Sequence, residues 1–124
     1  MRFLKSLAIA TLMSAPVYAD GSKAGEFDYY VLSLSWSPNW CAVTGDQKGS
    51  PQCRPEHDFG WIMHGLWPQY HRGWPSHCST SKRNPPRSLT DSMADIMGTS
   101  GLAWYQWKKH GKCSGLSGED YYAL

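Results

Sequence analysis

Four cysteines constrain the fold of this chain more than any other feature of its sequence: Cys41, Cys53, Cys78 and Cys113. No C-x-x-C spacing occurs among them, so a zinc ribbon is not indicated. In an oxidising compartment, two disulfides would staple a small domain. Of the possible pairings, proximity in the sequence favours Cys41–Cys53 with Cys78–Cys113, which adds no crossed loops.

The start of the chain predicts export into such a compartment. Arg2 and Lys5 precede an apolar run over residues 7–13, and residues 17–19 (VYA) form a small-x-small cleavage site. The apolar run is too short to span a bilayer. We therefore expect a signal peptide over residues 1–19, a periplasmic or secreted protein that starts near Asp20, and no membrane attachment after cleavage.

Without the predicted signal peptide the chain has 105 residues, which is enough for one domain. Removing Arg2 and Lys5 leaves ten basic and ten acidic residues, so its formal charge is zero. The distribution is uneven, because the segment from Arg72 to Lys112 holds seven basic residues and two acidic ones. A basic second half suits an anionic substrate, although such a cluster is more often a solvated face.

Alternating apolar residues predict two strands, over residues 27–36 and 59–66. We expect a turn at residues 37–39 after the first strand, and then a loop over residues 40–55 that its own disulfide closes. In the second strand, residues 60, 62, 64 and 66 should share one face, and Pro68 should end the strand. A long irregular segment over residues 69–87 follows, and a loop of that length favours a functional role.

Helical patterns occupy the second half of the chain. Ser88 is the expected N-cap of a short helix, with Asp91 completing a capping box and Gly98 ending the helix. An apolar stripe in that helix predicts core residues, and its members are Leu89, Met93, Ile96 and Met97. Ser117 is the expected N-cap of a final short helix.

Chemistry-bearing side chains concentrate in residues 104–113 (WYQWKKHGKC). In a helix, Gln106, Lys109 and His110 share one face, which places a fixed cation beside a titratable imidazole. Phosphoryl or acyl chemistry needs such a pair, with one group moving protons and the other stabilising an anion. The alternative is a solvated basic helix end that stops at Gly111.

The other histidines do not predict a metal site. His57, His64 and His71 are spaced seven apart, but glycines and prolines interrupt the interval and no H-E-x-x-H spacing occurs. For His64, among apolar neighbours near a strand end, a satisfied core position is the alternative to a functional one.

Two segments resemble the active-site segments of the T2 family of ribonucleases. Residues 61–68 (WIMHGLWP) resemble the first and residues 102–113 (LAWYQWKKHGKC) the second. Residues 32–36 (LSLSW), followed by Cys41, are similar to the family's N-terminal strand and first cysteine. The resemblance runs from about Phe27 to Leu124 and fits the bacterial periplasmic or secreted branch best.

The resemblance implies an α+β fold in which helices pack against an antiparallel sheet. It also implies an endoribonuclease that needs no metal or other cofactor and acts on single-stranded RNA. In such an enzyme the ribose 2′-hydroxyl attacks the adjacent phosphorus to give a 2′,3′-cyclic phosphate, which is then hydrolysed to a 3′-phosphate. Two histidines suit this chemistry because imidazole titrates near neutral pH.

By the same resemblance, His110 is the base, His64 the acid, and Lys109 stabilises charge on the phosphoryl oxygens. Trp67 matches a position that stacks on a base, and Cys78–Cys113 would tie the long loop to the end of the catalytic helix. The remaining candidates are Gln106 at the catalytic centre, Tyr105 as a phosphate contact, and Gln69 and Tyr70 near the base.

The chain departs from the family pattern in three places. Many members carry glutamate where this chain has Gln106, and many eukaryotic members carry a third histidine where it has Tyr105. Members also continue well past the second segment, so we expect residues 20–124 to be the N-terminal part of an incomplete domain. A catalytically inactive RNA-binding module is therefore the alternative function, and a disulfide-stapled structural or inhibitor domain with inert histidines is a further one.

Overall fold

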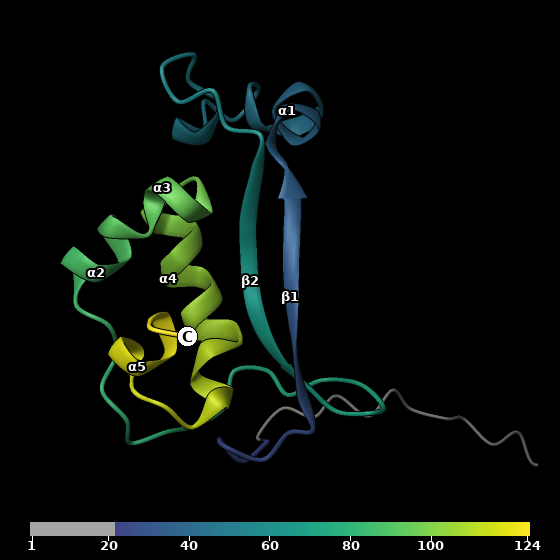
Figure 1. Cartoon of the computed structure of the whole chain (residues 1–124), viewed down its shortest axis with the longest axis vertical. Helices are drawn as coiled ribbons and strands as arrows, with labels where there is room; N and C mark the ends of the chain where they lie inside the picture. The colour runs from purple at the N-terminus through teal and green to yellow at the C-terminus, as the bar shows by residue number, and fades with distance from the viewer. Residues whose placement is uncertain (1–21) are drawn as a thin grey trace, which may run out of the picture.

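The computed structural model describes residues 22–124, and the predicted signal peptide over residues 1–19 lies outside the described residues. A two-stranded antiparallel sheet runs along the molecule, and most of the helices line its β2 side (Figure 1). None of the helices formed by residues 22–124 has the length and apolar character that a bilayer crossing requires. The α+β fold expected from the sequence is confirmed.

The sheet consists of β1 (Tyr29–Trp36) and β2 (Trp61–Gln69). Tyr29 lies opposite Gln69, and Trp36 opposite Trp61. Pro68 was expected to end the second strand, but β2 runs through it to Gln69. Proline is tolerated there because both strands of a two-stranded sheet are edge strands, so its missing N–H need not leave a ladder bond unmade.

The segment between the strands is more helical than its sequence indicated. A turn and a loop were expected, but α1 (Ser37–Trp40) leads directly into a π-helical turn at Cys41–Gly45. Pro38 favours this start, because its fixed φ suits the first turn of a helix and its absent N–H would be unpaired there anyway. A 3₁₀ turn at Pro51–Cys53 follows. The expected Cys41–Cys53 disulfide closes the segment, with an S–S distance of 2.09 Å.

The predicted helix over residues 88–97 forms as two pieces, α2 (Arg87–Ser92) and α3 (Ala94–Met97). Ser88 is not the N-cap, since Pro86 is the last extended residue (φ −66°, ψ 157°) and the helix has already begun at Arg87. Two consecutive prolines hold the preceding backbone extended, and that sets the start of α2. Gly98 ends α3 with φ 82°, a conformation that glycine adopts without strain.

The remaining helices are α4 (Ser100–Lys109) and α5 (Gly118–Tyr122), with a 3₁₀ turn at Gly111–Ser114 between them. The Thr99 hydroxyl caps α4 by accepting a 3.0 Å hydrogen bond from the Leu102 N–H. Ser117 caps α5 as predicted, accepting from the Asp120 N–H at 3.2 Å.

A small apolar core fixes α3 and α4 against β2. Its buried members are Met93, Met97 and Ala103, and the residues packed on it are Met63, Leu102 and Tyr122. Ile96 was expected in this core, but 49% of it is exposed. Met93 and Met97 are four positions apart and share the buried face, whereas Ile96 lies beside that face and is turned towards solvent.

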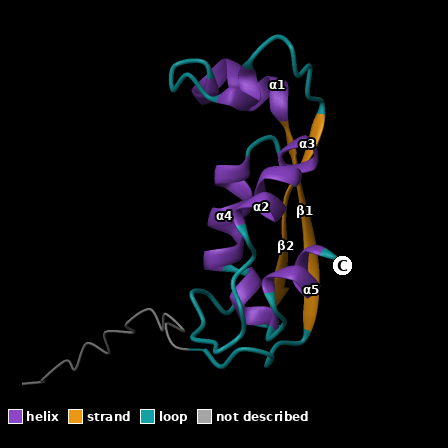
Figure 2. Cartoon of the chain, turned by 90° about the vertical axis from the view of Figure 1, so that its left-hand side faces the viewer, coloured by secondary structure: helices purple, strands orange, loops and turns teal. Residues whose placement is uncertain are grey.

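The outer edge of β1 lies away from the helices α2 to α5 (Figures 1 and 2). Leu32 and Leu34 remain 56% and 54% exposed along it. Within residues 22–124 nothing pairs with that edge, since the sheet has two strands only. An uncharged, unpaired strand edge is a template for association with another chain.

Candidate active site

A cavity of about 500 Å³ opens between β2 and the C-terminal half of α4. Seven residues singled out from the sequence line it: His64, Trp67, Gln69, Tyr105, Gln106, Lys109 and His110. Two further lining residues, Val31 and Trp74, were not singled out. Tyr70 was singled out but is not among the lining residues.

His64 reaches this cavity through a β-bulge. Ser33 pairs with Gly65 and Leu34 pairs with Met63, which leaves His64 as the extra residue on β2. A bulge re-aims a side chain and shifts the alternation of the strand. The expected face of residues 60, 62, 64 and 66 is therefore wrong, because Ile62 and Gly65 are the buried residues on either side of the bulge. His64 also lines a second cavity of about 250 Å³.

His110 is the C-cap of α4, and its N–H donates a 2.9 Å hydrogen bond to the Gln106 carbonyl. Its side chain is deeply buried, because the residue is only 4% exposed. The imidazole lies almost parallel to the Trp67 indole, with ring centroids 4.8 Å apart and planes inclined by 24°. Its Nδ1 atom is buried and has no hydrogen-bond partner among the described residues.

Gln106 lies one helical turn before His110 and is 2% exposed. Its Oε1 atom accepts a 2.8 Å hydrogen bond from the Trp67 Nε1–H. Gly65 makes room for this contact, since a Cβ atom there would lie 2.4 Å from Trp67 Nε1 and 2.9 Å from Gln106 Oε1. The prediction that Gln106, Lys109 and His110 share one face is confirmed, since all three line the cavity.

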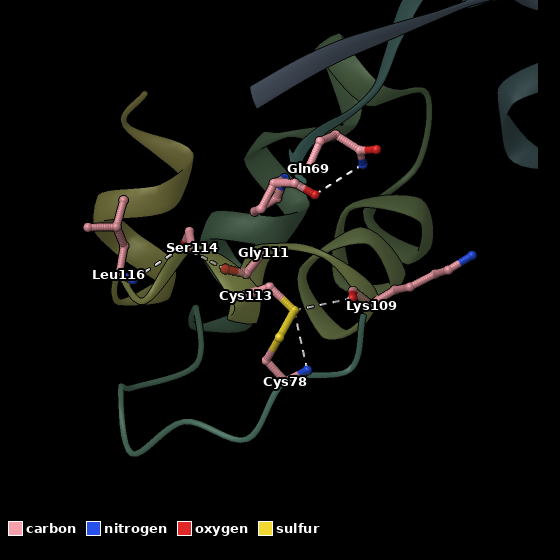
Figure 3. The surroundings of a disulfide bond; sticks show 8 residues. Gln69, Cys78, Lys109, Gly111, Cys113, Ser114 and Leu116 are labelled. Carbon is pink, nitrogen blue, oxygen red and sulfur yellow. Dashed lines mark hydrogen bonds between the residues drawn. A yellow bond between two sulfur atoms is a disulfide. The ribbon is translucent and has the colours of Figure 1, made fainter. Parts of the chain in front are cut away.

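The loop after β2 is fastened to the end of α4 beside Lys109. The Lys109 carbonyl accepts a 2.8 Å hydrogen bond from the His77 N–H, and the expected Cys78–Cys113 disulfide follows with an S–S distance of 2.12 Å. Figure 3 shows the Lys109 carbonyl facing the Cys113 sulfur while the Lys109 side chain points away from it. The Lys109 Nζ atom lies 5.9 Å from the centroid of the Tyr105 ring.

The two overlooked residues differ in the signals that could have revealed them. Val31 lies directly opposite Trp67 in the sheet register, so its place beside the cavity follows only from the pairing of the two strands. Trp74 is 57% exposed in the loop that Cys78 anchors. A large exposed aromatic in a long loop is itself a signal of a binding surface.

Burial and neighbouring positive charge lower the pKa values of both histidines. Burial lowers the pKa of His110 most, and Lys109, His77 and His64 lower it further, to about 4. Burial and Lys109 also lower the pKa of His64. His110 is therefore neutral near pH 7 and able to accept a proton.

We expect this buried imidazole to make the protein less stable in acid. Because its pKa is about 4 when folded against an ordinary 6.5, the unfolded chain binds more protons between those values. The free energy of unfolding should therefore fall as the pH drops from 6.5 towards 4. Urea unfolding across this range measures the effect, and His110→Asn should flatten the dependence. An unchanged slope in that variant would contradict the assignment to His110.

Comparison with known proteins gives one consistent result. Residues 27–123 match the Ribonuclease T2 family. A ribonuclease of Aeromonas hydrophila is 40% identical over 98% of this chain and 53% of its own length. A probable ribonuclease of Haemophilus influenzae is 33% identical over 77% of this chain and 40% of its own length. The chain thus spans about half the length of these curated relatives.

A solved structure agrees with the sequence comparisons. The RNase-related protein from Calystegia sepium superposes with a TM-score of 0.61 at 27% identity, covering 79% of this chain and 56% of its own. Ribonuclease 1 of Arabidopsis thaliana is 28% identical over 90% of this chain and 54% of its own length.

Proposed function

The chain belongs to the ribonuclease T2 family, and from this premise we propose that it cleaves single-stranded RNA by transesterification at the cavity between β2 and α4. The observation that carries the proposal is that His64 and His110, 46 positions apart in the sequence, line one cavity together with Lys109. The reaction needs two proton-transfer groups and one fixed cation, and this set supplies them.

In the first step, neutral His110 takes the proton of the ribose 2′-hydroxyl, and the 2′-oxygen attacks the adjacent phosphorus. The bond from phosphorus to the 5′-oxygen breaks, and that oxygen takes a proton from His64. The products are a 2′,3′-cyclic phosphate and a free 5′-hydroxyl. Hydrolysis of the ring by water then reverses the two proton transfers and leaves a 3′-phosphate.

The protonation states required by this scheme suit the electrostatics of the site. The lowered pKa of His110 keeps it unprotonated at neutral pH. His64 must carry a proton, although burial and Lys109 lower its pKa in the free chain. A bound phosphodiester carries a negative charge, which favours the protonated form of His64 and offsets the effect of Lys109.

The walls of the cavity suit a nucleotide. Trp74 and Tyr105 expose aromatic surface beside it, and base stacking on such rings tolerates any base. Gln69 offers an amide for a base edge, although its Nε2 now donates to the Pro68 carbonyl at 3.0 Å. Tyr70 is the weakest of the candidate base contacts, because it does not line the cavity.

Export to the periplasm or the medium is part of this proposal. Its support is the signal-like sequence over residues 1–19 and the two disulfides, which an oxidising compartment maintains.

The test is cleavage of single-stranded RNA by the oxidised chain in excess EDTA, with the products separated by their 3′ ends. We expect fragments ending first in 2′,3′-cyclic phosphate and later in 3′-phosphate. The two imidazoles can perform both proton transfers, so EDTA should leave the rate unchanged. Fragments with 5′-phosphate ends, or loss of activity in EDTA, would contradict the mechanism.

A second candidate function is an RNA-binding module without turnover. The observation that favours it is Gln106, which lines the cavity and has an amide that cannot exchange a proton in the working range. A folded chain that binds single strands, with affinity falling as salt rises, but never cleaves them would select this alternative.

A further inference from the structure

We propose that Trp67 is a positioning residue that orients His110 for proton transfer, and that Gln106 acts through Trp67 by fixing the position of its indole. The proposal rests on the proposed role of His110 as the proton acceptor. It gives Gln106 a task that needs no proton exchange and assigns to Trp67 a role other than base stacking.

The first step concerns what holds the His110 ring. Imidazoles that act in proton transfer or metal binding are usually oriented by a carbonyl or carboxylate at the nitrogen not used in the reaction. Among the described residues, His110 Nδ1 has no such partner although it is buried. Side-chain packing must therefore determine the orientation of the ring.

The packing partner is the Trp67 indole. It lies against the face of His110 with a centroid distance of 4.8 Å, and its edge meets the His64 ring at 5.8 Å with an interplanar angle of 89°. One indole thus contacts both imidazoles of the site. A shift of this ring would change the position of His110 and its separation from His64 together.

The indole is itself held from two directions. Gln106 Oε1 accepts the 2.8 Å hydrogen bond from Trp67 Nε1–H. Gln106 is itself buried, with only 2% of the residue exposed. The neighbouring Leu66 carbonyl accepts a hydrogen bond from the Tyr121 hydroxyl, which ties β2 to α5 at this point. Gly65 completes the fit, because any side chain there would occupy the space of the Trp67–Gln106 contact.

The charges around His110 explain why a neutral acceptor suits this arrangement. The titratable groups that act on His110 are Lys109 from α4, His64 from β2 and His77 from the loop, and each is cationic when protonated. The Gln106 amide holds Trp67 without adding a negative charge that would favour the imidazolium form of His110. His110 therefore stays neutral while its ring is held in place.

The experiment compares Trp67→Phe, Gln106→Met and the double variant. Trp67→Phe removes the indole N–H but keeps a ring able to stack on a base, and Gln106→Met removes the acceptor at similar volume. We expect each single variant to lower kcat at least about tenfold with KM changed by less than about twofold. Because both changes break one contact, the double variant should lose no more than the larger single loss.

An NMR titration of the His110 imidazole gives a readout that does not depend on RNA. In both single variants water gains access to the ring, so the His110 resonances should shift and its titration should move up towards the ordinary value of 6.5. The control is Trp74→Phe, which alters an indole of the same cavity for which no ring contact with His110 is found. It should leave the His110 titration unchanged.

The outcomes separate this proposal from the proposed function. An unchanged His110 titration in Trp67→Phe and Gln106→Met would overturn the positioning role, whatever the cleavage assay shows. A rise in KM with kcat retained would also overturn it, because that is the signature of a base-stacking residue. Multiplying losses in the double variant would show that Gln106 acts independently of Trp67. Absence of cleavage by the parent chain, with the His110 shifts present, would reject the proposed function and leave the positioning contact established.

Discussion

His110→Ala is expected to reduce cleavage of single-stranded RNA by about a thousandfold, because it removes the group that accepts the 2′-hydroxyl proton. The lowered pKa of His110 makes it the stronger candidate for the base of the pair, since it is neutral across the working range. Initial rates in EDTA near pH 6, with the oxidised variant checked for cooperative unfolding, measure the effect. Binding of RNA should be much less affected than turnover.

The matched control is His57→Ala. His57 is an exposed histidine that stacks on Phe59 at 5.2 Å and is not among the residues of the candidate site, so its loss should leave the rate within about twofold. His64→Ala should resemble His110→Ala, and the double variant should be little worse than either, because residues that act as a unit are not additive. A His110→Ala chain that cleaves RNA at the parent rate would exclude the proton-acceptor role.

Local patterns predicted much of the architecture. Apolar alternation located both strands, and the two antiparallel strands formed as expected. Proximity in the sequence predicted both disulfides, because pairing each cysteine with a neighbouring one adds no crossed loops. Helical spacing placed Gln106, Lys109 and His110 on one face, since three and four residues apart is one turn. Each of these patterns depends on neighbours in the sequence.

The errors occurred where tertiary contacts override a local pattern. The alternation of β2 could not reveal that His64 is a bulge, because the extra residue is defined by its pairing with β1. Ser88 was a plausible N-cap, but Pro86 had already set the helix boundary. Pro68 was a plausible strand end, but an edge position made it tolerable.

The internal contacts of the site were the least predictable. The resemblance implied that Trp67 stacks on a base and placed Gln106 at the catalytic centre, but it did not indicate that the two side chains bond to each other across 39 positions. The sequence also offered no reason for a glycine at position 65. The structure supplies one, because a side chain there would collide with Trp67 and Gln106. Residue types indicated the chemistry, whereas the hydrogen bonds that hold the site are properties of the fold.

Loss of the Cys78–Cys113 disulfide is expected to lower both stability and activity. In the chain-entropy treatment, a bridge across 35 positions stabilises the folded state by about 4 kcal/mol. The same bridge fastens the loop that carries Trp74 to the end of α4, next to the His77 contact with Lys109. Cys78→Ala with Cys113→Ala should therefore reduce the free energy of unfolding by about that amount. Cleavage should also fall at least about tenfold under conditions where the variant is still folded.

The other disulfide is the control for this effect, because it closes a segment remote from His110. Cys41–Cys53 spans 12 positions and should contribute about 3 kcal/mol. Replacing that pair by alanine should lower the urea midpoint and leave the rate of the folded variant within about twofold. Equal losses of activity from the two pairs would mean that stability alone, rather than the fastening of the loop to α4, limits cleavage. A selective loss from the Cys78–Cys113 pair would show that the loop helps to form the site, since both variants lose comparable stability but only one loses the anchor beside Lys109.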